Sequence, residues 1–122
     1  MSVNKKLILI IEDNKDMQSL LVNIFEEEGF RTLIADNGET AINMFDDLNI
    51  DVMLLDKRLP DIDGFSIISQ ARDLGLDSKI VLLTAYGDPA IQKRALDLGA
   101  DAYMTKPFNN FELISLVKQI VG

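Results

Sequence analysis

Short runs of consecutive apolar residues alternate along this chain with longer segments in which apolar residues recur every three or four positions. The clearest run is 52–56, where four apolar residues lead directly into the carboxylate of Asp56. A run this short and uniform, bounded by turn residues, is typical of a strand buried on both faces. Such strands belong to parallel sheets covered by helices, so the pattern predicts an α/β fold.

Five strands are predicted in this way. The first, third and fourth are almost wholly apolar and therefore central, the second is more polar and suits an edge, and the fifth is short. The predicted strands are residues 7–11, 31–35, 52–56, 79–84 and 102–105.

Each predicted strand is followed by a segment with helical spacing. Asn14, Asp88 and Asn109 are placed to begin helices, and Gly29 and Gly99 are placed to end them. The side chains expected on the buried helix faces are Met17, Leu20, Leu21, Ile24 and Phe25; Ala41, Ile42, Phe45 and Leu48 in a helix over about 39–48; Phe65, Ile68 and Ala71; Ile91, Ala95 and Leu98; and Phe111, Ile114, Val117 and Ile120.

Five strand–helix units predict one flavodoxin-like (βα)5 domain over residues 1–122, with no output domain. Right-handed crossovers and the polarity of the strands favour the order 2-1-3-4-5, with helices on both faces of the sheet. Ligands of such sheets bind beyond the carboxyl ends of the strands, where the order reverses. That point lies between strands one and three, so Glu12 and Asp13 are expected beside Asp56.

The amino-acid composition excludes several classes of function and partner. The net charge of −8 argues against nucleic acid as a partner, because phosphate binding needs clustered Lys and Arg. The chain has no cysteine and no histidine, which excludes disulfides and thiolate chemistry and suits the cytoplasm. The apolar run 7–11 is too short for a signal peptide or a membrane span, so no membrane partner is expected.

Three carboxylates at one strand edge need a compensating charge. Two like charges 4 Å apart repel by ~1 kcal/mol in water and ~4 kcal/mol at an effective dielectric constant near 20. A proton, a lysine or a metal ion relieves this, and an all-oxygen ligand set favours Mg²⁺. The topology also delivers Lys106, after strand five, and the hydroxyl of Thr84, at the end of strand four.

An acidic pocket with Mg²⁺, a lysine and a hydroxyl suits the transfer of a phosphoryl group. No histidine or cysteine exists in the chain, and the pocket offers no serine, so the nucleophile must be a carboxylate. Asp56 lies between the other acids and the lysine and is the best placed acceptor, through an aspartyl phosphate.

These motifs resemble the receiver domain of two-component response regulators over essentially the whole chain. The resemblance implies that Asp56 accepts a phosphoryl group from a sensor histidine kinase or a histidine phosphotransferase protein. The motifs are Glu12-Asp13, Asp56 with Pro60 and Asp63-Gly64, Thr84-Ala85, and Lys106-Pro107-Phe108.

The resemblance also implies a role for each site residue. Asp13 and Asp56 would bind Mg²⁺ directly, together with the backbone carbonyl of Arg58. Glu12 would act on the metal through a water molecule.

Three further roles follow from the same resemblance. Lys106 would pair with the phosphate, and its peptide bond to Pro107 would be cis. Thr84 would move to bond the phosphate, and Tyr103 would turn inward with it.

Among family members the run 84–87 looks most like the sporulation phosphorelay intermediate, a stand-alone regulator that passes phosphate to a second histidine protein. The chemotaxis motor regulator is the next resemblance, which would act by phosphorylation-dependent binding to a downstream protein. On either resemblance this chain is expected to be a monomer. It is also expected to have no enzymatic activity beyond its own phosphorylation and slow dephosphorylation. Lys57 departs from the family pattern, since many members have an apolar residue there; strand alternation directs it away from Asp56.

Simpler interpretations remain for each motif. Glu12 and Asp13 could simply be the start of a loop and a helix cap, with no chemical role. Tyr103 could be a core aromatic residue. Asp61 and Asp63 are expected to be turn residues. A receiver-shaped binding module that is never phosphorylated is the alternative function. A flavin carrier is disfavoured because the acids after strand one would repel the cofactor phosphate. A dehalogenase-type phosphatase is disfavoured because Arg58 stands where that chemistry needs a second acid.

Overall fold

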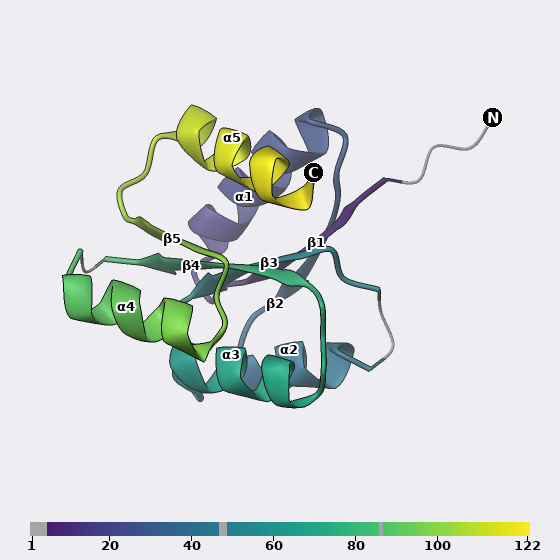
Figure 1. The fold of residues 1–122 in the computed structure, drawn as a ribbon. Helices are drawn as coiled ribbons and strands as arrows, with labels where there is room; N and C mark the ends of the chain where they lie inside the picture. The colour runs from purple at the N-terminus through teal and green to yellow at the C-terminus, as the bar shows by residue number, and fades with distance from the viewer. Residues whose placement is uncertain (1–4, 47–48, 86) are drawn as a thin grey trace.

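Five strands and five helices alternate in the computed structural model, which describes residues 5–46, 49–85 and 87–122 (Figure 1). The strands are β1 (Leu7–Ile11), β2 (Arg31–Ala35), β3 (Val52–Asp56), β4 (Lys79–Thr84) and β5 (Ala102–Thr105). The helices are α1 (Lys15–Glu27), α2 (Gly38–Met44), α3 (Gly64–Asp73), α4 (Pro89–Leu98) and α5 (Asn110–Val121).

The strands form one parallel sheet in the order β2-β1-β3-β4-β5, which confirms the predicted flavodoxin-like topology. In this register Ile11 lies opposite both Ala35 of β2 and Leu55 of β3, so the carboxyl ends of these strands meet at one edge. The polar strand β2 lies at the edge of the sheet, as expected.

Helices cover both faces of the sheet. Figure 1 shows α1 and α5 on one side and α2, α3 and α4 on the other. The side chains of β1 alternate between the two faces of the sheet. Ile8 and Ile10 pack with α1 and α5, whereas Leu9 and Ile11 pack with the other three helices. All four are fully buried, which explains why a central strand reads as a continuous apolar run.

The helix boundaries follow the predicted capping residues. The side chains of Asn14, Asp88 and Asn109 each accept a hydrogen bond from a backbone N–H in the first turn of the following helix. Gly29 and Gly99 adopt φ values of 91° and 118°, a left-handed conformation that suits glycine after a helix. In the part of the chain that the structure describes, no helix has both the length and the apolarity needed to cross a membrane.

The predicted end of α2 was wrong. The helix stops at Met44 rather than at residue 48, although Phe45 is buried as expected. Residues 46 and 47 are both aspartates in the sequence, and negative charges are unfavourable at a helix C-terminus. Leu48, expected to face inward, lies outside the described residues, as does Tyr86 in the predicted loop after β4.

The assignment of Phe111 to the core was also wrong, because its side chain is 76% exposed. The residues of α5 that are fully buried are Leu113 and Val117, one helical turn apart. Phe111 precedes Leu113 by two positions, which places it about 200° around the helix and toward solvent. Ile114 and Ile120 flank the buried stripe and are partly buried.

Candidate functional site

Three carboxylates converge at the carboxyl edge of the sheet. Glu12 and Asp13 directly follow β1, and Asp56 is the last residue of β3. Because β1 and β3 are adjacent and parallel, one carboxylate oxygen from each of the three residues lies within 4.8 Å of the others. The topology argument therefore placed the cluster correctly.

Lys106 reaches the same cluster from the segment after β5. Its ammonium lies 3.0 Å from Glu12 Oε1 and 3.4 Å from Asp56 Oδ1. The Lys106 backbone N–H donates to the carbonyl of Thr84 at 2.7 Å, and the peptide bond between Lys106 and Pro107 is cis. One cation is thus shared by two of the three acids.

The acids differ in their exposure to water. Glu12 is 2% exposed, whereas Asp13 is exposed and the Asp56 side chain is 13% exposed. Burial raises the pKa of the Glu12 carboxyl, and the hydrogen bonds from the Asn14 N–H and from Lys106 oppose that effect. Glu12 is therefore the buried member of the cluster, and Asp13 faces solvent.

Gln18 supports the site but was not predicted. This buried side chain donates from Nε2 to the Glu12 carbonyl at 2.6 Å and to Asp36 Oδ1 at 2.7 Å. These bonds tie the turn after β1 to the end of β2. The sequence did carry a signal, because residue 18 lies three positions before Leu21 and seven before Phe25, which places a polar residue on the buried stripe.

Thr84 and Tyr103 lie on β4 and β5, the two strands that follow β3 in the sheet order. Thr84 ends β4 and is 1% exposed, while Tyr103 in β5 is partly buried against the core. A Cβ added to Gly87 would lie 4.0 Å from the Tyr103 hydroxyl oxygen, so that hydroxyl adjoins the loop after β4. The switching roles of Thr84 and Tyr103 stay predictions.

The loop after Asp56 folds tightly against the start of α3. The Arg58 N–H donates to Asp56 Oδ1 at 3.3 Å, and Arg58 forms an antiparallel bridge with Asp63. The Gly64 N–H donates to the carbonyl of Lys57 at 2.9 Å. A Cβ on Gly64 would lie 2.9 Å from Lys57 Cα and 3.0 Å from the Asp56 carbonyl oxygen, so this close approach requires glycine.

Lys57 points away from the acids, as strand alternation predicted. Its ammonium lies 3.4 Å from Asp63 Oδ2 and 4.8 Å from the centre of the Phe65 ring, both at the start of α3. Asp63 also caps α3, because its Oδ1 accepts from the Phe65 N–H at 2.7 Å. The departure from the family pattern at Lys57 therefore adds a contact to α3.

Asp61 does more than form a turn. Its two carboxylate oxygens accept hydrogen bonds from the N–H groups of Gly38 and Glu39, at 2.8 and 2.9 Å. These N–H groups belong to the first turn of α2, and their hydrogen bonds lower the pKa of the Asp61 carboxyl. The β3–α3 loop is thereby fastened to α2.

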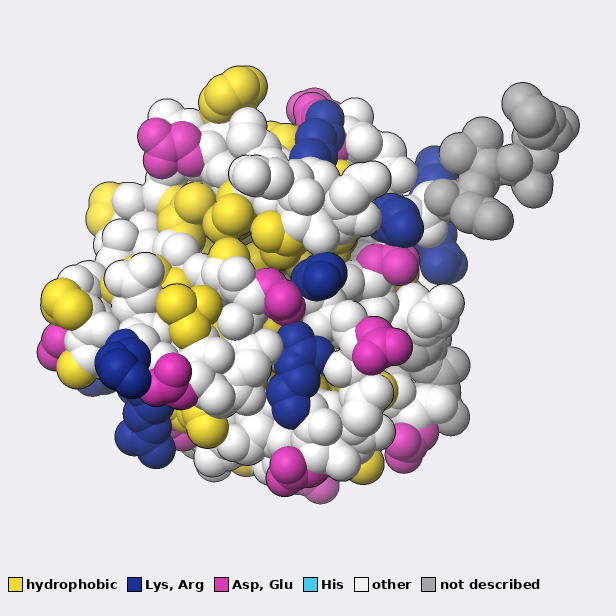
Figure 2. Space-filling view, in the orientation of Figure 1, with side chains coloured by type: hydrophobic (Ala, Val, Ile, Leu, Met, Phe, Trp, Pro, Cys, Tyr) yellow, Lys and Arg dark blue, Asp and Glu magenta, His cyan; other side chains and the backbone are white. Residues whose placement is uncertain are grey.

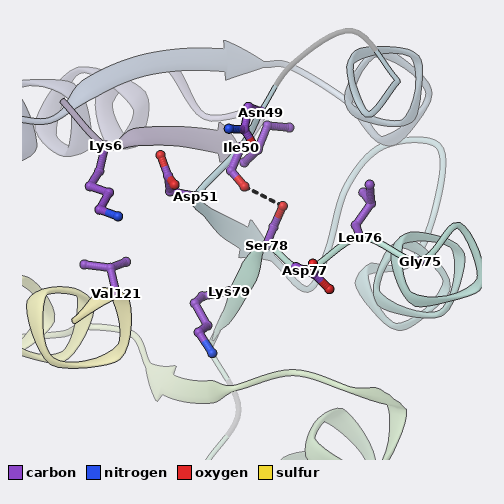
Figure 3. A pocket seen from close by; sticks show the side chains of 10 residues that line it. All are labelled: Lys6, Asn49, Ile50, Asp51, Gly75, Leu76, Asp77, Ser78, Lys79 and Val121. Atoms are coloured by element: carbon purple, nitrogen blue, oxygen red, sulfur yellow. Dashed lines mark hydrogen bonds between the residues drawn. The ribbon is translucent and has the colours of Figure 1, made fainter. Parts of the chain in front are cut away.

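A pocket of about 400 Å³ opens at the opposite edge of the sheet, where the strands begin (Figure 3). Two of its polar side chains bond to the backbone: Asp51 Oδ2 accepts from the Leu7 N–H at 2.8 Å, and Ser78 Oγ donates to the Ile50 carbonyl at 2.6 Å. The three clustered carboxylates lie at the other edge, so the chemistry does not coincide with this pocket.

Residues 8–118 match the response regulator receiver domain family. The transcriptional regulatory protein CpxR of Escherichia coli K12 is 36% identical over 114 residues, which cover 93% of this chain and 48% of CpxR. The regulatory protein VanRc of Enterococcus gallinarum is 37% identical over 111 residues, or 91% of this chain and 48% of VanRc. The chain thus spans about half the length of these curated relatives.

The solved structure of the Francisella response regulator 1452 receiver domain superposes with a TM-score of 0.92 at 29% identity, covering 96% of this chain and 97% of that one. The receiver domain of DrrB, activated by BeF3, gives a TM-score of 0.88 at 27% identity, covering 97% and 98%. Sequence and fold agree, and the chain belongs to the response regulator receiver domain family.

Proposed function

We propose that the Asp56 carboxylate accepts a phosphoryl group from a phosphohistidine of a sensor histidine kinase or a histidine phosphotransferase protein. The observation that carries this proposal is the convergence of Glu12, Asp13 and Asp56 with Lys106 at the carboxyl edge of the sheet. A carboxylate is a known nucleophile for phosphoryl transfer, and a lysine beside it stabilises the charge of the transferred group.

In the proposed reaction an Asp56 oxygen attacks phosphorus as the phosphorus–nitrogen bond to the donor histidine breaks. The product is an aspartyl phosphate, and the departing imidazole leaves with the electron pair of that bond. The Lys106 ammonium, 3.4 Å from Asp56 Oδ1, stabilises the negative charge of the phosphoryl oxygens. Glu12 holds Lys106 in position at 3.0 Å.

The residues present suit a Mg²⁺ ion. Their donors are carboxylate oxygens grouped within 4.8 Å, and Asp13 keeps the group open to water, as a partly hydrated ion requires. Asp13, Asp56 and the Arg58 carbonyl would hold the ion, with Glu12 acting through a water molecule. When bound, Mg²⁺ neutralises the acids and the incoming phosphoryl oxygens, so the reaction depends on Mg²⁺.

The domain would relay its signal in the cytoplasm, similar to the sporulation phosphorelay intermediate. On this proposal it is no enzyme, beyond its own phosphorylation and slow dephosphorylation. A chemotaxis-type regulator that binds a target when phosphorylated is the alternative. The relatives CpxR and VanRc are named as regulatory proteins about twice as long, which supports signalling but does not favour either form of output.

The proposed docking surfaces lie on two sides of the site. The donor would dock at α1, beside Asp56, and a partner that reads phosphorylation would dock on α4, β5 and α5. Figure 2 shows hydrophobic side chains gathered between α4 and α5 on this face. Leu96 on α4 and Phe111 on α5 are large exposed apolar side chains of the kind that partners bind.

Incubation with acetyl phosphate and Mg²⁺, followed by mass spectrometry, tests the proposal. Wild-type protein should gain one phosphoryl group on Asp56, and Asp56→Asn should gain none. An unmodified wild type, or a phosphorylated Asp56→Asn variant, would overturn the assignment and favour a binding module that is never phosphorylated.

A further inference from the structure

The Phe65 ring contacts cations from two different elements. The Lys57 ammonium lies 4.8 Å from the ring centre, and the guanidinium carbon of Arg94 lies 4.7 Å from it. Both distances are within the range of a cation–π interaction. Lys57 is the residue directly after Asp56, and Arg94 is in the middle of α4, so one ring joins the phosphoacceptor loop to α4.

Lys57 is held at both its backbone and its side chain. The backbone N–H of Lys57 donates to the Leu83 carbonyl at 2.9 Å, and its ammonium pairs with Asp63 at 3.4 Å. Asp63 in turn caps α3 through the Phe65 N–H. Lys57, the residue after Asp56, is therefore held by β4, by the N-cap of α3 and by the Phe65 ring.

The C-terminal end of α4 is anchored independently of Arg94. The guanidinium of Arg72 on α3 donates to the carbonyl of Gly99 at 3.0 Å and to that of Leu76 at 2.7 Å. A Cβ on Gly99 would lie 2.7 Å from Arg72 Cγ, so the two elements are closely packed there. This anchor holds the C-terminal end of α4 against α3 through contacts that do not involve Arg94.

The middle of α4 is packed less closely against α3. A hollow of about 250 Å³ lies between the two helices, bounded by Phe65 and Arg94 and by Ser66, Ser69, Gln70 and Leu98. Arg94 itself is exposed, so its contact with Phe65 can be broken without opening the core. The Arg94–Phe65 contact can therefore restrain α4 and be broken if α4 moves.

We propose that Arg94 is a positioning residue, whose contact with Phe65 restrains α4 and thereby opposes phosphorylation at Asp56. The inference rests on the proposed function, and it further takes phosphorylation at Asp56 to rearrange the β4–α4 loop and α4. A contact made in only one of two arrangements lowers the affinity of any ligand that needs the other arrangement. Loss of the Arg94 contact therefore raises the affinity of the site for a phosphoryl analogue.

Titration with beryllofluoride at saturating Mg²⁺, followed by amide NMR signals, tests this inference. Arg94→Met keeps most of the side-chain volume and removes the charge, and it should raise the affinity about two- to fivefold, the value of an exposed cation–π contact. Arg94→Lys keeps a cation and should stay near wild type. The matched control is Lys93→Met, because Lys93 pairs with Asp97 on the same helix at 2.8 Å and should have no effect.

A second background separates this role from a general loss of packing. In Phe65→Leu protein, Arg94→Met should no longer change beryllofluoride affinity, because the shared ring is gone. If Arg94 has a purely structural role, Arg94→Met should lower the melting temperature without raising the affinity for beryllofluoride, and that result would overturn the inference. An equal gain in beryllofluoride affinity from Arg94→Met in the Phe65→Leu background would overturn it too. If wild-type protein binds no beryllofluoride, the proposed function is overturned together with the inference. If wild-type protein binds beryllofluoride in a manner that depends on Asp56, but Arg94→Met binds it with the wild-type affinity, only the inference is overturned.

Discussion

The Lys106 ammonium bridges Glu12 and Asp56, at 3.0 and 3.4 Å, although the lysine and the glutamate lie 94 positions apart in the chain. Glu12 is almost completely buried, so this lysine offsets a carboxylate charge that is largely removed from bulk solvent. Asp56 takes part in the same contact from a more open position. The bridge therefore positions the cation beside the oxygen that is proposed to react.

Lys106→Met should slow phosphorylation of Asp56 by acetyl phosphate about 100-fold, the typical cost of removing one group that stabilises developing negative charge. The rate of phosphoprotein formation at saturating Mg²⁺ measures this effect. Lys118→Met, which removes the surface partner of Glu28 at the C-cap of α1, is the control and should leave the rate unchanged. A Lys106→Met rate equal to that of wild type would exclude Lys106 from the transfer step.

Mg²⁺ should raise the melting temperature of wild-type protein but scarcely that of Asp13→Ala. A ligand that binds only the folded state contributes about 2.7 kcal/mol at a concentration 100 times its Kd. Thermal unfolding with and without millimolar Mg²⁺ measures the difference. Asp16→Ala, which removes a nearby exposed acid in the first turn of α1, should respond like wild type. Equal shifts in Asp13→Ala and wild type would count against the proposed metal site.

Asp61→Ala should be less stable than wild type at neutral pH, by an amount that shrinks in acid. The N–H groups of Gly38 and Glu39 lower the pKa of folded Asp61 below its unfolded value of about 3.9. The stabilisation is therefore complete above that unfolded value and is lost as the pH falls through the folded pKa. Urea unfolding between pH 7 and pH 3 measures the gap between the two proteins, and a gap that grows in acid would contradict this assignment. Glu27→Ala, an exposed acid on α1, serves as the control.

Gln18→Met should cost about 1–3 kcal/mol of unfolding free energy, because it leaves the Glu12 carbonyl without its donor in a buried position. Methionine fills a similar volume, so packing alone changes little. Gln92→Met, on the exposed side of α4, is the matched control. Denaturant unfolding of both variants gives the comparison, and equal stabilities would show that the Gln18 hydrogen bonds contribute nothing.

The central strands could be read from the sequence because their side chains are buried on both faces, which leaves uninterrupted apolar runs such as Leu7–Ile11. The end of α2 and the exposure of Phe111 were misjudged because apolar spacing alone does not fix where a helix ends or which stripe packs. In α5 the stripe of Leu113 and Val117 lies against the sheet and leaves Phe111 in solvent.

The acidic cluster could be predicted because strand order alone brings residues 12, 13 and 56 to one edge of the sheet. Contacts made by long side chains between elements could not, since they depend on rotamers and helix positions. The four hydrogen bonds of Arg72 and the approach of Arg94 to Phe65 are of this kind. Gln18 could be predicted only in part. Its position on a buried helix stripe marks this polar residue as unusual, but the sequence does not show which groups it bonds to.

Since the reacting groups occupy one edge of the sheet, the turns at the other edge are free to tolerate engineering. The α1–β2 turn lies at that far edge, and an insertion there has to keep Gly29, whose φ of 91° ends α1. A fluorescent tag or an affinity peptide grafted into this turn would report on the protein while leaving its acids and Lys106 in place.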